Sequence, residues 1–172
     1  MSAEDAAISL WSLNEQHEDE RVGPTATEAR NHFSLPGEGR TEAVLGTLAT
    51  YKVEASETGG QLVCAEITVP PGQGIPPHRH NQEDEAFYVL AGRVVIEGDE
   101  CGDGGVSLDA GGFFYGPRGR VHGFRCDGDE TARLLLLVSP GTGIGAMFTE
   151  LAALTRQQQR DGVDPAHVVA PH

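Results

Sequence analysis

Three residues near the middle of the chain, His78, His80 and Glu85, have side chains that bind transition metals. They fall in the stretch "PPHRHNQEDEAFYVLAG", which spans residues 76–92, and a further histidine, His122, follows in "GFFYGPRGRVHGF". Imidazole nitrogens with one carboxylate oxygen suit divalent ions such as Fe, Ni, Mn, Co, Cu or Zn. These four residues are therefore predicted to hold one metal ion, with open positions on it for a substrate or O₂.

The residues around these donors predict strands that aim them at one another. Pro76 and Pro77 favour extended backbone, and in a strand His78 and His80 would share a face because side chains alternate. The turn-forming stretch "NQED" follows, and Glu85 then opens a second strand with Phe87 and Val89 on its own side. His122 shares strand parity with Phe124 in the same way, so all four donors are expected inside a barrel.

The rest of the chain supports an all-β fold. From Leu35 to Pro140, short runs rich in β-branched and aromatic residues alternate with clusters of Gly, Pro and Asp, which predicts a sandwich or barrel. The expected strand runs are "AVLGTLATYKV", "QLVCAEITV", "AFYVLAGRVVIEG", "GFFYGP", "HGFRC" and "ARLLLLV".

The two ends of the chain have different patterns from the barrel. Residues 1–34 are predicted to be an N-terminal arm anchored by Trp11, residues 35–141 the β-barrel, and residues 142–172 a C-terminal helix and tail. The helix is expected because apolar residues recur at three- and four-residue spacing, as on one helix face. These residues are Ile144, Met147, Phe148, Leu151 and Leu154.

Length and charge narrow the classes of function. A chain of 172 residues is about one domain, and a net charge of −14 is a poor match for the basic surface that nucleic acids require. Three cysteines without CxxC spacing favour a reducing cytoplasm, and no apolar run approaches the roughly 18 residues of a membrane span. We therefore expect a cytoplasmic protein with a small-molecule substrate and neither nucleic acid nor membrane as a partner.

Two stretches resemble the paired motifs of the cupin superfamily. "GQGIPPHRHNQEDEAFYVLAG" fills each fixed position of the first motif, with Gly72, His78, His80, Glu85 and Gly92. "GGFFYGPRGRVH" fits the second motif with Gly111, Pro117, Gly119 and His122, whereas the final Asn of that motif is Cys126 here. The resemblance implies a double-stranded β-helix (jelly-roll) barrel. The Cys126 departure lies outside the metal ligands and concerns local turn packing.

A further resemblance is to the quercetinase-like single-domain cupins. It covers roughly residues 35–155 and includes "LPGEGRTEAVLGTLATYKVEASETGGQL" and "PGTGIGAMFTELA". In that family three His and one Glu hold the metal, and the substrate cleaved is a flavonol. The resemblance implies a metal-dependent dioxygenase acting on a flavonol, enol or phenol, with Glu85 as ligand and general base.

Two other functions fit the same residues. One is a metal-assisted isomerase, cyclase or epimerase that tailors a polyketide-like or sugar-like intermediate without O₂. The other is a cupin that binds a small molecule without turnover. Oxygen uptake separates the dioxygenase from both, and product formation under nitrogen separates the remaining two.

Apolar residues near the motifs are candidates for the walls of a substrate pocket, although each is individually more typical of barrel core. They are Phe87, Phe113, Tyr115, Phe124, Met147 and Phe148. Arg79 and Arg93 are expected to form surface ion pairs rather than substrate contacts, and Cys101 and Cys126 are assigned no catalysis. The remaining histidines, at 17, 32, 167 and 172, are expected to be structural or solvated.

A homodimer is the expected assembly. Open β-barrels expose strand edges that need covering, and the N-terminal arm carries Leu10, Trp11 and Leu13, which could pack across a partner.

Overall fold

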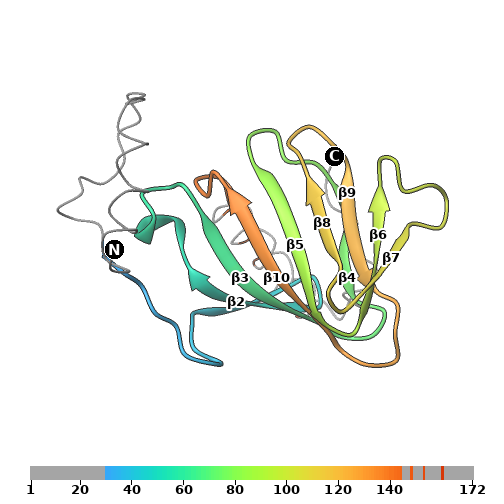
Figure 1. The fold of residues 1–172 in the computed structure, drawn as a ribbon, viewed down its shortest axis with the longest axis horizontal. Coiled ribbons are helices and arrows are strands. Elements are labelled where there is room, and N and C mark those ends of the chain that lie inside the picture. Colours follow the sequence, from blue (N-terminus) through green and yellow to red (C-terminus); the bar gives the residue numbers. More distant parts are fainter. Residues whose placement is uncertain (1–29, 145–147, 149–152, 154–159, 161–172) are drawn as a thin grey trace, which may run out of the picture.

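The structure is a computed structural model that describes residues 30–144 together with residues 148, 153 and 160. Ten strands and one short 3₁₀ helix form within these residues (Figure 1). In chain order they are β1 (Thr41–Val44), β2 (Thr47–Val53), η1 (Ala55–Glu57), β3 (Val63–Val69), β4 (Gly74–His78), β5 (Asp84–Ala91), β6 (Arg93–Gly98), β7 (Val106–Asp109), β8 (Phe113–Gly116), β9 (His122–Cys126) and β10 (Ala132–Ser139).

The strands form two antiparallel sheets that make a jelly-roll barrel. The larger sheet has the order β1-β2-β3-β10-β5-β8, and the smaller sheet has the order β4-β9-β6-β7. In Figure 1, β5 and β8 of the larger sheet lie beside β4 and β9 of the smaller one. Because the first half of β5 pairs with the end of β10, and β4 pairs with β9, residues far apart in sequence meet inside the barrel.

Strict alternation of side chains fills the barrel. In β5 the inward residues Glu85, Phe87 and Val89 are buried, whereas Tyr88 and Leu90, which have the opposite parity, are exposed. β10 alternates in the same way, with Ala132, Leu134, Leu136 and Val138 buried. Phe87 is the hub of an aromatic group in the core, with its ring centroid 5.7 Å from that of Phe114 and 5.0 Å from that of Phe124. The all-β prediction and each expected strand run are thus confirmed.

The expected N-terminal arm and most of the expected C-terminal helix lie outside the described residues, and both stay predictions. Two residues of the expected helix face are described: Ile144 and Phe148 are buried in the core, and the Phe148 ring meets Tyr51 edge-on at 6.3 Å between centroids. Within the described part of the chain, no helix has the length and apolar character that crossing a membrane requires.

Candidate metal centre

The four predicted donors converge at one point inside the barrel. His78 ends β4, His80 follows it, Glu85 lies in β5 and His122 opens β9. One ligand atom from each lies within 4.8 Å of the others. The Nε2 atoms of His78 and His80 are 3.0 Å apart, and Glu85 Oε2 is 3.0 Å from His80 Nε2. The other carboxylate oxygen of Glu85, Oε1, is 3.4 Å from His122 Nε2.

The second nitrogen of two imidazoles is held by the backbone. His78 Nδ1 lies 3.0 Å from the carbonyl of Pro76, and His122 Nδ1 lies 3.2 Å from the carbonyl of Arg120. A carbonyl can only accept, so both rings carry their proton on Nδ1 and turn the Nε2 lone pair toward the centre. Metal-binding histidines in proteins are oriented by hydrogen bonds of this kind.

His122 Nε2 is buried and has no hydrogen-bond partner among the described residues. A buried polar atom without a partner is costly, and a ring nitrogen with a free lone pair is satisfied by a metal ion. Donors bound to one ion at about 2.0–2.2 Å lie roughly 3 Å apart when they occupy neighbouring positions, which matches the observed separations. The donor set therefore fits a transition metal.

Burial and charge make Glu85 an ionised ligand. Its side chain is almost fully buried, and burial alone would raise the pKa of the carboxyl group. The adjacent imidazoles of His122, His80 and His78 outweigh burial and lower that pKa to about 2. Burial lowers the pKa of His80, but the hydrogen bond to Glu85 and the charge of Glu85 raise it by a larger amount, so the pKa is raised overall. The pKa of His78 is lowered, chiefly because the ring is buried.

A bulge in β4 turns His78 toward the centre. Ile75 pairs with Phe124 and His78 pairs with His122, so β4 has one residue more than β9 between these two pairs. In a regular strand, alternation would send residues three apart, such as Ile75 and His78, to opposite faces, whereas the extra residue lets both face the same side. Pro76 and Pro77 occupy the bulge, where a missing N–H costs no ladder hydrogen bond. The sequence predicted extended backbone here but not the change of register.

Small residues surround the His122 ring and the bulge. A Cβ added to Gly116 would lie 2.9 Å from His122 Nδ1. A Cβ added to Gly123 would lie 2.7 Å from both the Ile75 carbonyl oxygen and the Pro77 nitrogen. Both positions therefore need glycine, because the first contact is with a ligand ring and the second is with backbone.

Replacement of Gly123 by alanine is therefore expected to displace the bulge and to weaken metal binding by about 10- to 100-fold, the usual effect of disturbing the residues that orient ligands. Gly128→Ala is the matched control, since a Cβ there has its nearest contact at 3.8 Å. The measurement is metal affinity by competition with a chelator. Equal affinities of the two variants would show that the bulge does not position His78.

The loop that carries His122 is tied to the segment that carries the other ligands. Asp84 accepts hydrogen bonds from Arg118 N at 2.9 Å and from Nε and Nη2 at 3.0 Å each. The Gly119 N–H donates to the His80 carbonyl at 2.7 Å. The hydrogen bonds of Arg118 lower the pKa of Asp84 to about 2, so this carboxylate stays charged. This contact could not be predicted from the sequence, because nothing in the spacing of residues 84 and 118 indicates it.

Removal of the clamp by Asp84→Ala is expected to weaken metal binding by roughly 10-fold, because the two ligand-bearing segments lose a three-bond connection. Asp109→Ala removes a surface ion pair with Arg93, at 2.7 Å, that lies away from the ligands, and it should leave affinity unchanged. Chelator competition on both variants checks this, and a loss of affinity in Asp109→Ala as large as in Asp84→Ala would contradict it.

The predicted pocket residues divide into three groups. Phe87 and Phe124 are buried and face the inside of the barrel, as expected. Phe113 and Tyr115 are 58% and 54% exposed on the outer face, so their place in an interior pocket is corrected. Both side chains point outward because they are two residues apart in β8. Phe114, which lies between them, points inward, and its ring centroid is 5.5 Å from that of His122.

The last two predicted pocket residues lie near the C-terminal end. Phe148 is buried against Tyr51, and Met147 lies outside the described residues. A carboxylate that the sequence analysis did not single out, Glu83, is also buried, and its charge contributes to the raised pKa of His80.

The other predicted residues lie away from the centre. Arg93 pairs with Asp109 on the surface, Arg79 is exposed, and His32 Nδ1 lies 3.0 Å from Glu57. Cys126 is buried, with Sγ 3.2 Å from the Glu130 carbonyl, so it braces the turn that follows β9. His17, His167 and His172 lie outside the described residues.

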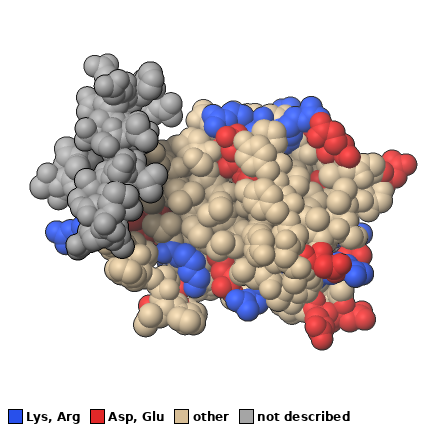
Figure 2. All heavy atoms as spheres, viewed as in Figure 1, with Lys and Arg blue, Asp and Glu red and all other residues tan. Residues whose placement is uncertain are grey.

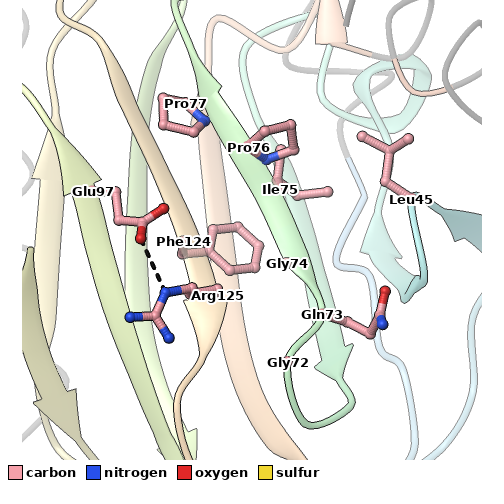
Figure 3. Close-up of a pocket in the computed structure, with 10 residues that line it drawn as sticks. All are labelled: Leu45, Gly72, Gln73, Gly74, Ile75, Pro76, Pro77, Glu97, Phe124 and Arg125. Carbon is pink, nitrogen blue, oxygen red and sulfur yellow. Dashed lines mark hydrogen bonds and ion pairs between the residues drawn. The ribbon is translucent and has the colours of Figure 1, made fainter. Parts of the chain in front are cut away.

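A separate hollow of about 200 Å³ lies beside β4 and includes none of the four donors (Figure 3). Leu45, Ile75, Pro76 and Phe124 contribute apolar surface to it, and the ion pair between Arg125 and Glu97 lies at its margin. The hollow is therefore distinct from the metal centre.

The protein is thus a jelly-roll barrel whose interior holds three histidines and one glutamate in an arrangement that suits a metal ion. Residues 65–138 match the family model described as "Cupin domain". These residues therefore form a cupin domain, as the motifs indicated.

Among curated proteins, the chain is similar to quercetin 2,3-dioxygenase of Bacillus subtilis, with 33% identity over 86 residues. The match covers 49% of this chain and 24% of that protein, so the chain spans about a quarter of this relative's length.

Solved structures show the same fold. KdgF from Halomonas sp. is 21% identical with a TM-score of 0.55, over 64% of this chain and 94% of that one. An RmlC-like cupin from Shewanella frigidimarina is 23% identical with a TM-score of 0.53, over 64% and 92%. The polyketide cyclase RemF from Streptomyces resistomycificus is 25% identical with a TM-score of 0.53, over 64% and 78%.

Proposed function

We propose that this cupin is a metal-dependent dioxygenase of the quercetinase-like type, acting on a flavonol, enol or phenol. The observation that carries the proposal is the convergence of four donors, of which three are buried and His78 is partly buried. Backbone carbonyls direct the Nε2 lone pairs of two of the imidazoles inward. The similarity to quercetin 2,3-dioxygenase supports the choice of reaction.

The residues that would hold the metal are His78, His80, Glu85 and His122. A divalent transition metal bound there would act as a Lewis acid and lower the pKa of an enol or phenol hydroxyl. Glu85 accepts the hydroxyl proton on a carboxylate oxygen, which leaves the substrate as an electron-rich enolate. O₂ is the oxidant: the substrate supplies the electrons, and both oxygen atoms are added to it as a carbon–carbon bond breaks.

The walls of the site suit such a substrate because they include aromatic rings. Phe114 lies against His122, and Phe87 and Phe124 continue the apolar surface behind it. A water-poor site strengthens the electrostatic contacts of a bound enolate and protects it from reprotonation by solvent.

A metal-dependent cyclase or isomerase is the second candidate function. The similarity to the polyketide cyclase RemF favours it, since that fold neighbour reaches 25% identity. In this reaction Glu85 would move a proton between two atoms of the substrate, and O₂ would not be consumed.

The test begins with elemental analysis of the purified protein, which should find about one transition metal per chain. Oxygen consumption is then measured with quercetin and a panel of flavonols and polyphenols. Uptake that depends on the bound metal supports the dioxygenase. Product formation under nitrogen without uptake in air would overturn it in favour of the cyclase or isomerase, and binding without any product would identify a binding protein.

A further inference from the structure

The outer face of the larger sheet carries an unusual number of exposed apolar side chains. Five large ones lie on three neighbouring strands, and together they are called the outer patch. They are Tyr88 and Leu90 on β5, Phe113 and Tyr115 on β8, and Leu137 on β10, with exposed fractions of 45%, 39%, 58%, 54% and 36%. Single exposed apolar residues are ordinary on protein surfaces, but a contiguous group of this kind marks an interaction site.

Strand register makes the outer patch continuous. Tyr88 pairs with Phe113 on one side and with Leu135 on the other. In the next row Ala86 pairs with Tyr115 and with Leu137. Directly paired residues have their Cβ atoms about 4.5–5.5 Å apart on the same face, so each row is an unbroken apolar band across β8, β5 and β10. The second row ends at Cys64 on β3, which pairs with Leu137.

The charged residues beside the outer patch are neutralised in pairs. Arg133 Nε lies 2.8 Å from Glu66 Oε1, and Arg118 makes two side-chain contacts with Asp84. Figure 2 shows one broad face of the molecule with its charged side chains gathered mainly around the margin. Because the chain has a net charge of −14, two copies repel at a distance, and close approach requires a surface without unpaired carboxylates. The outer patch meets that requirement.

We propose that the outer patch is the surface through which two copies of this chain form a twofold-symmetric dimer. Three rings of roughly 150–250 Å² each, about half exposed, present on the order of 300 Å² of aromatic surface. A standard interface needs about 800 Å² per partner with an apolar centre, and the outer patch supplies that centre while the paired ions supply the rim. β8 is also the last strand of its sheet among the described residues, so its outer edge lies open beside the patch.

A second copy is the occupant that fits because the patch is a sheet face with no charged side chain of its own. A twofold axis through the patch would set each aromatic row against the same row of the other copy, as an isologous interface requires. A basic partner would instead be drawn to the unpaired acidic groups elsewhere on this chain. The proposed dimer interface is thus the outer patch, whereas the sequence suggested the N-terminal arm.

The first measurement is the mass of the full-length protein by sedimentation equilibrium at about 10 µM, a concentration at which a micromolar or tighter dimer is largely formed. Twice the chain mass of 18.2 kDa is expected. Tyr88→Glu places a charge at the centre of the patch and is expected to give the mass of one chain. Val106→Glu is the control, because Val106 is 46% exposed on β7 of the other sheet, and it should leave the dimer intact.

A second measurement needs no variant and applies even if Tyr88→Glu fails to fold. Cys64 is half-buried at the end of the patch, and Cys101 is half-buried in the hairpin between β6 and β7. Maleimide labelling of Cys64 should slow several-fold when the protein is concentrated from monomer to dimer, whereas labelling of Cys101 should stay constant. A monomeric wild type, a dimeric folded Tyr88→Glu protein, or a Cys64 rate independent of concentration would each overturn the proposal.

Discussion

Replacement of Glu85 by glutamine is expected to lower turnover per bound metal by about 100- to 10,000-fold, the range that a general base contributes. The amide keeps the shape of the carboxylate and one oxygen that can face the metal, but it cannot accept a proton. Three histidines retain many divalent ions, so metal content should fall only in part. The quantity compared is oxygen consumption on the best substrate, divided by metal content.

The control for this prediction is Glu57→Gln, which changes a carboxylate that pairs with His32 on the surface, far along the chain from the ligands. It should match the wild type in both metal content and rate. Unchanged activity per metal in Glu85→Gln would mean that Glu85 is a ligand only, and that another group moves the proton.

Metal content itself should collapse when a histidine ligand is removed. His80→Ala and His122→Ala are each expected to reduce content from about one ion per chain to a small fraction of that, because a four-donor site loses one of its imidazoles. In the His122 variant a polar cavity also remains where the ring packed on Phe114. The measurement is elemental analysis after dialysis against a metal-free buffer.

His32→Ala provides the matched control for these two variants, since His32 pairs with Glu57 outside the cluster. Circular dichroism on each protein shows whether the barrel has formed. Retention of a full complement of metal by folded His80→Ala and His122→Ala proteins would rule out the ligand assignment.

Much of the fold and all four converging donors could be predicted from the sequence, because alternation and turn residues are local signals. Glu85 with Phe87 and Val89, and His122 with Phe124, face inward as their parity predicted. The same rule accounts for the correction at β8. Phe113 and Tyr115 share a parity, and only the pairing of Glu85 with Gly116 determines which parity faces inward.

Other features could not be predicted because they depend on contacts between distant segments. The bulge at Pro76 and Pro77 is defined by its register against β9, and a sequence pattern carries no register. The bond between Asp84 and Arg118 joins residues 34 positions apart and has no periodic signal. Phe114 was not among the predicted pocket residues, although its inward position follows once β8 is paired with β5.

Strand β5 has two separate uses on its two sides. Glu85 and Phe87 point to the metal centre and the core, while Tyr88 and Leu90 point outward. Insertion or deletion of a single residue between 85 and 88 would exchange the two sets beyond that point, because successive side chains alternate. The side chains at the candidate metal centre and those on the outer surface thus depend on the same strand length, so an insertion or deletion would disturb both at once. This strand can therefore change by substitution, but not by insertion or deletion of a residue.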